Sequence, residues 1–174
     1  AYDEIIGRGV DLDGVLVQEM IKGDREFVIG LSRDPQFGPC VMFGIGGIFT
    51  EVIKDVSFRV APLTEMDAEE MIDEIQTRKL LGEFRGSPAI DRAELVKALM
   101  GIGRLGLEND EIAEIDINPL IVDGDKPVAV DALVRIDQDG AYANLVLPKL
   151  LERSKLSERD RAFATQLVCG PVRA

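Results

Sequence analysis

Two carboxylates and one carboxamide lie where the sequence predicts two neighbouring strands. In the segment EIDINPLIV, Asp116 and Asn118 are two residues apart, so in a strand their side chains share one face. Asp131 follows after a tight turn and can lie beside them. Carboxylate and amide oxygens are hard ligands that suit Mg²⁺, which also keeps waters and binds substrate phosphate oxygens. The alternative is that all three are polar residues on the solvated face of an antiparallel strand pair.

A second candidate is the glycine-rich segment FGIGG, which includes Gly46 and Gly47. Glycine permits positive φ and close approach, so backbone N–H groups there could contact an anion. The segment lacks the Lys-Ser/Thr of a P-loop and the spacing of a dinucleotide fingerprint, and a bulged strand is the alternative. Arg59, on a later strand, could offer its guanidinium fork to phosphate oxygens, although an exposed arginine is the usual case.

Composition excludes several other chemistries. The 174 residues contain no His, so Ser-His-Asp or Cys-His nucleophiles, His metal sites and a phosphohistidine are excluded within this chain, and no catalytic residue is predicted. A net charge of -12 makes nucleic-acid binding by most of the chain unfavourable. Two cysteines without metal-ligand spacing and the absence of an evident signal peptide predict a cytoplasmic protein, and no apolar run is long enough to span a membrane.

The predicted elements form an α+β fold, an antiparallel sheet with two packed helices. Four β-rich runs come first: 14–20 and 25–32, expected to pair as a hairpin across Lys22-Gly23-Asp24, then 39–47 and 56–62. Thr64 caps a helix expected to end near Gly82, and Asp91 caps a second over 91–109. Two strands, 111–122 and 128–136, complete the sheet and carry the candidate metal ligands.

The last part of the chain differs in composition. From residue 137 onward basic residues exceed acidic ones by one, so residues 1–136 carry the remaining -13. The segment reads as helical, with a break near Pro148 and a cap at Ser157, and is too short to bury a core alone. We therefore predict two parts, residues 1–136 and a short helical tail, 137–174.

Residues 1–136 closely resemble the ATP-grasp region of ADP-forming acyl-CoA (acetate-CoA) synthetases, relatives of the succinyl-CoA synthetase beta subunit. The strings that carry the resemblance, in order, are GVLVQEMIKGDREFVIGLSRDPQFGPCVMFGIGGIFTEVIKDVSFRVAPLTEMDAEEMIDEI, EIDINPLIV and PVAVDALVRI. The resemblance implies the C-terminal subdomain of an ATP-grasp fold. The tail is similar to the start of the NusB-like domain of ribosomal RNA cytosine-5 methyltransferases, through AYANLVLP and RDRAFATQLV.

The resemblance also implies ligands and roles. It implies that ATP or ADP binds with its base at the hinge formed by Gln18, Glu19 and Met20, and that Asn118 and Asp131 hold Mg²⁺ against the phosphates. Asp116 occupies a place where relatives often have Glu. The family makes acid, CoA and ATP from acyl-CoA, ADP and phosphate through a phosphohistidine, which would lie on a CoA-binding ligase domain or subunit.

The sequence departs from the family pattern at both ends. The leading ATP-grasp subdomain, with the lysine that meets the phosphates, would precede Ala1, so the chain alone is expected to be inactive. The tail predicts a recombined or mis-joined chain with a seam between about Ala129 and Ile136. If residues 128–136 form a strand against 115–122 the ATP-grasp interpretation survives there, whereas a continuous helix would contradict it. The alternative function is a non-catalytic fragment whose tail binds RNA or protein.

Overall fold

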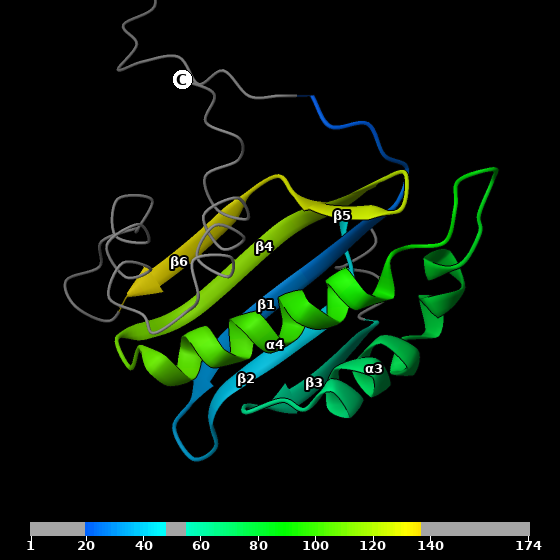
Figure 1. Cartoon of the computed structure of the whole chain (residues 1–174). Helices are drawn as coiled ribbons and strands as arrows, with labels where there is room; N and C mark the ends of the chain where they lie inside the picture. The colour runs from blue at the N-terminus through cyan, green and yellow to red at the C-terminus, as the bar shows by residue number, and fades with distance from the viewer. Residues whose placement is uncertain (1–19, 48–54, 137–174) are drawn as a thin grey trace, which may run out of the picture.

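The computed structural model describes residues 20–47 and 55–136, which fold into a sheet with two helices on one face (Figure 1). The strands are β1 (Glu26–Asp34), β2 (Gly38–Ile45), β3 (Val56–Val60), β4 (Ile112–Asp123), β5 (Lys126–Ala129) and β6 (Ala132–Ile136). The sheet order is β3-β2-β1-β4-β5, with β6 also paired to β4, and every pairing is antiparallel. The predicted α+β class, an antiparallel sheet with packed helices, is confirmed.

Strand β1 pairs with β2 through a tight turn. The Asp34 carboxylate accepts hydrogen bonds from the backbone N–H groups of Gln36 and Phe37, at 2.7 and 2.9 Å, and Gly38 has a φ of 79°. An aspartate that binds the N–H groups two and three residues ahead closes such a turn locally. The predicted hairpin partner of this strand, residues 14–20, lies outside the described residues except for Met20.

The first helix, α3 (Glu65–Glu74), begins as predicted and ends earlier. Thr64 and Asp67 form a reciprocal capping box at its start. The prediction that it continues to Gly82 is wrong, because residues Gln76–Leu81 form the 3-10 helix η2. The cause is Asp55, whose carboxylate accepts hydrogen bonds from the N–H groups of Gln76 and Thr77, both at 2.7 Å, and so starts a separate helical turn.

The second helix, α4 (Arg92–Glu108), crosses the sheet beside α3 (Figure 1). Asp91 caps its start by accepting the Glu94 N–H at 3.2 Å, as predicted. A Cβ at Gly106 would lie 2.5 Å from the end of the Leu31 side chain, so a larger residue there would require this side chain to shift. The core fills the layer between the helices and the sheet; its fully buried members include Phe27, Ile29, Phe43, Met71, Leu99, Ile112 and Ile117.

Residues 126–136 test the ATP-grasp interpretation of the segment before the tail. They form two strands, β5 against Leu120–Asp123 and β6 against the segment from Ile112 to Ile117. The prediction of one strand over 128–136 is therefore wrong in detail, since the regular strand is interrupted between Ala129 and Ala132. The strand outcome agrees with the ATP-grasp interpretation of this segment and contradicts a continuous helix. The tail, 137–174, lies outside the described residues, and its NusB-like character stays a prediction.

None of the helices in the described ranges is long and apolar enough to cross a membrane.

Candidate functional site

Strand β4 places Asp116 and Asn118 on the face of the sheet that the helices leave uncovered. Ile115 and Ile117 are buried in the core, whereas Asp116 is half-buried and Asn118 is exposed. The two polar side chains therefore share a face, as the alternation predicted. Asp116 lies opposite Gly30 of β1 on one side and opposite Leu133 of β6 on the other.

The backbone brings Asp131 beside Asn118. The pairing of β1 with β4 shifts register between Phe27 and Ile29, so β4 carries an extra residue at Asn118–Pro119. The Asn118 N–H donates to the Asp131 carbonyl at 3.2 Å, and the Val130 N–H donates to the Pro119 carbonyl at 3.1 Å. The crossing from β5 to β6 is thus tied to this bulge. We call Asp116, Asn118 and Asp131 the metal corner.

The electrostatics of the metal corner favour a cation. Burial raises the pKa of the Asp116 carboxyl above its usual value, and the nearby carboxylates of Glu114 and Asp131 raise it further. A positive ion among these groups would offset both effects. Within residues 20–47 and 55–136, no three His, Cys, Asp or Glu side chains converge as a metal site. Two carboxylates and an amide fit a Mg²⁺ ion that draws its remaining ligands from water and substrate oxygens.

In the glycine-rich segment FGIGG, the close approach of neighbouring strands explains the glycine at position 46. Its N–H donates to the Glu26 carbonyl at 2.8 Å, and a Cβ there would lie 2.7 Å from the Phe27 carbonyl oxygen. A Cβ at Gly44 would lie 2.6 Å from the Asp55 carbonyl oxygen. Close strand approach therefore requires glycine at both positions, and the Gly46 N–H is already used. Gly47 has a φ of 69°, and its predicted contact with an anion stays a prediction.

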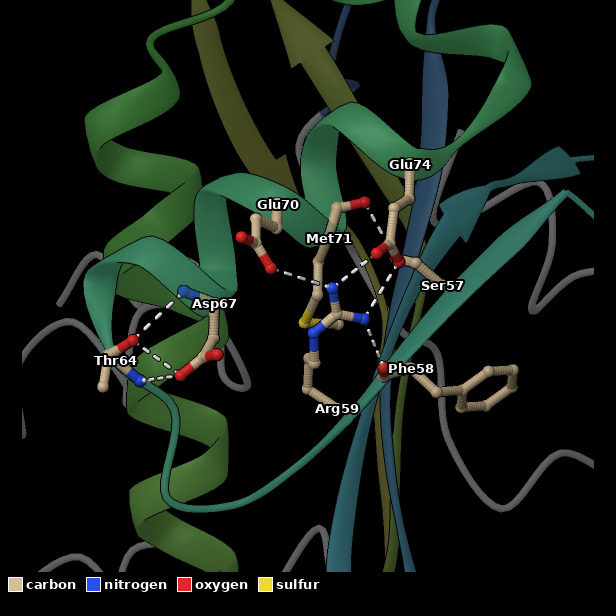
Figure 2. Close-up of polar contacts among 8 residues, drawn as sticks. All are labelled: Ser57, Phe58, Arg59, Thr64, Asp67, Glu70, Met71 and Glu74. Atoms are coloured by element: carbon tan, nitrogen blue, oxygen red, sulfur yellow. Dashed lines mark hydrogen bonds and ion pairs between the residues drawn. The ribbon is translucent and has the colours of Figure 1, made fainter.

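Arg59 lies on the opposite face from the metal corner. Figure 2 shows its guanidinium between Glu70 and Glu74 of α3, while the Phe58 ring points away from the helix. The Arg59 to Glu70 distance is 3.3 Å, and the pKa of Arg59 is raised, first by its hydrogen bond from Nη2 to Glu74. This geometry therefore does not support the predicted phosphate contact. The guanidinium of Arg59, on β3, already donates to the two glutamates of α3.

Of the predicted hinge residues, only Met20 is described, and it is 85% exposed. Gln18 and Glu19 lie outside the described residues, so their contact with a base stays a prediction.

Arg25, which the sequence did not predict as important, is the most deeply buried charged residue among those described. Its side chain donates to four backbone carbonyls, those of Leu80 and Gly82 at 3.1 Å and those of Pro88 and Gly124 at 2.9 Å. Its residue exposure is 2%, and among the described residues its Nε has no hydrogen-bond partner, although it lies 3.8 Å from the Asp24 carboxylate. A lone arginine before an apolar strand gives no signal of this role in the sequence.

The sequence model of the ATP-grasp domain matches residues 2–136. The chain belongs to the ATP-grasp family. Among curated proteins, it is 51% identical over 122 residues to the beta subunit of ADP-forming acetate–CoA ligase I from Pyrococcus furiosus, covering 70% of this chain and 53% of that protein. It is 43% identical over 112 residues to an ADP-forming 4-hydroxybutyrate–CoA ligase from Nitrosopumilus maritimus, covering 64% and 16%.

A solved structure supports the ATP-grasp assignment at the level of the fold. Acetyl-coenzyme A synthetase 1 from Ca. Korarchaeum cryptofilum, in complex with coenzyme A and Mg-AMPPCP, is similar with a TM-score of 0.69 and 51% identity. The match covers 78% of this chain and 61% of that chain. This ATP-grasp chain spans about half the length of the Pyrococcus beta subunit and a much smaller share of the Nitrosopumilus ligase.

Proposed function

We propose that this chain supplies part of the Mg-nucleotide site of an ADP-forming acid–CoA ligase. The observation that carries the proposal is the metal corner, where a bulge and a backbone hydrogen bond bring Asn118 to Asp131 beside Asp116. Its oxygen donors would hold Mg²⁺, which neutralises charge on the β- and γ-phosphate oxygens of bound nucleotide. The homologous Korarchaeum structure with Mg-AMPPCP supports the same pair of ligands, nucleotide and Mg²⁺.

The wider reaction requires a partner. In the Korarchaeum synthetase, a phosphohistidine segment points towards the nucleotide-binding site. This chain has no histidine, so the phosphoryl carrier would come from a CoA-binding ligase domain or subunit. The proposed role of this chain is therefore to bind and orient the nucleotide phosphates, in the cytoplasm, with no catalytic side chain of its own.

Calorimetry with ATP and Mg²⁺ on the full chain tests the metal corner. We expect Asn118→Ala and Asp131→Ala each to weaken Mg-dependent nucleotide affinity at least tenfold, because each removes an oxygen ligand. Asp123→Ala is the matched control: this exposed carboxylate lies on the same strand, five residues beyond Asn118, and should leave affinity unchanged. Equal affinity in the native and substituted chains, or no binding by the native chain, would remove the proposed function.

A further inference from the structure

The loop between η2 and α4, residues 83–88, contains an unusual turn at residues 84–87. Phe84 and Ser87 exchange two backbone hydrogen bonds, at 3.1 and 2.8 Å, across Arg85 and Gly86. These two central residues have φ values of 47° and 87°. Two left-handed residues in succession make a type I′ turn, which normally begins with Asn, Asp or Gly. Arg85 is the one non-glycine residue in the described ranges with a positive φ. We call residues 83–88 the Arg85 loop.

The Arg85 guanidinium lacks the ion pair that most arginines of the described ranges have. It stacks over the Phe84 ring at 5.2 Å from the ring centroid and has no carboxylate partner among the described residues. Five other arginines do have one; they are Arg25, Arg33, Arg59, Arg92 and Arg135. A guanidinium that stacks on a ring keeps its in-plane N–H donors available for a second, two-oxygen acceptor.

The loop is anchored by hydrogen bonds at both ends although it projects from the body of the fold (Figure 1). Arg25 donates to the Gly82 carbonyl before the loop and to the Pro88 carbonyl after it. The Ile90 N–H then donates to the Leu81 carbonyl at 2.9 Å. A group presented on a fixed backbone loses little conformational entropy on binding, which favours recognition. The fold thus presents Arg85, with its left-handed backbone, at an exposed position on an anchored loop.

We propose that the Arg85 loop docks on a charged surface of the ligase domain or subunit that completes the enzyme, with Arg85 binding a carboxylate there. This inference rests on the proposed function for the existence of such a partner. Glu83, an exposed carboxylate on the same loop, disfavours a free phosphate dianion and suits a protein surface that carries both signs of charge. The fork of the guanidinium matches two carboxylate oxygens.

The test uses the full chain and the companion subunit of the Pyrococcus furiosus ligase whose beta subunit is 51% identical over 122 residues. Biolayer interferometry measures the Kd of the pair for the native chain and for Arg85→Asn, Arg85→Lys and Arg104→Gln. Arg104 is the matched control, an exposed arginine on α4 with ordinary helical backbone. Thermal unfolding of each variant separates docking from stability, because asparagine fits the left-handed position better than arginine does.

We expect Arg85→Asn to raise the Kd at least tenfold while its Tm equals or exceeds that of the native chain. Arg85→Lys should keep part of the affinity, and Arg104→Gln should change neither quantity. An Arg85→Asn chain that binds as tightly as the native one, or a native chain that does not bind the companion subunit, would overturn the proposal. So would Arg85-dependent binding of inorganic phosphate or coenzyme A without that subunit. Mg-nucleotide calorimetry on the same samples shows separately whether the nucleotide site has failed.

Discussion

Replacing Arg25 by methionine should be among the most destabilising single changes in the described fold. Methionine keeps much of the volume and removes every donor. The change leaves four carbonyl groups, on Leu80, Gly82, Pro88 and Gly124, without their partner. These carbonyls belong to three separate chain segments, so the arginine joins the end of η2, the Arg85 loop and the turn between β4 and β5.

The magnitude follows from the hydrogen bonds and the burial. At a net value of about 1 kcal/mol for each bond, four bonds contribute about 4 kcal/mol. Pro88 and Gly124 are exposed, so water can rebind part of what is lost there. Removing a cation that is 2% exposed also recovers some of its burial cost. We therefore expect Arg25→Met to lower the free energy of unfolding by about 3 kcal/mol, a large share of the stability of a small domain.

Urea unfolding of the full chain, followed by far-UV circular dichroism, measures this difference. Arg104→Met is the control, since it removes an exposed arginine from α4. Arg25→Lys should lose at least half as much stability as Arg25→Met, because an ammonium group cannot reach four carbonyls arranged around a planar guanidinium. Loss of a contact at the protein surface usually costs less than about 1 kcal/mol. A loss of that size for Arg25→Met would refute this account of the buried arginine.

Two further predictions concern Asp55 and Arg59. Burial raises the pKa of the Asp55 carboxyl, but hydrogen bonds from Thr77 and from the Gln76 N–H outweigh it and hold the pKa below its usual value. The contribution of Asp55 is therefore present above the ordinary carboxyl pKa of about 4 and is lost as the pH falls further. Asp55→Asn should cost about 2 kcal/mol at neutral pH and make unfolding less pH-dependent in acid, as urea titrations at several pH values would show; an unchanged acid slope contradicts it. Arg59→Gln should cost less than about 1 kcal/mol and leave nucleotide affinity unchanged by calorimetry, whereas a lost affinity would restore the phosphate contact.

The sequence predicted those features that depend on neighbouring residues. The alternation in EIDINPLIV put Ile115 and Ile117 into the core and Asp116 and Asn118 on the other face, because a strand has a period of two. Helix starts were equally local, since the side chain of Thr64 binds an N–H group only three residues ahead.

Features that depend on distant residues were not predicted. The end of α3 is set by Asp55, which lies 21 and 22 residues before the two N–H groups that it binds. The partners of Arg59 lie on the following helix, 11 and 15 residues away, and no local pattern distinguishes this ion pair from a phosphate contact. Arg25 binds carbonyls up to 99 residues away, and carbonyls are present at every residue, so composition and spacing cannot identify them.

The buried arginine connects the two proposed sites. Through Gly82 and Pro88 it fixes the Arg85 loop, and through Gly124 it fixes the turn that joins β4, which carries Asn118, to β5, which Asp131 follows. Asn118→Ala should therefore weaken nucleotide binding alone, and Arg85→Asn should weaken docking alone. Arg25→Lys should weaken both in any sample that remains folded, because one cation positions both segments. Loss of only one of the two activities in folded Arg25→Lys would show that the segments are positioned independently.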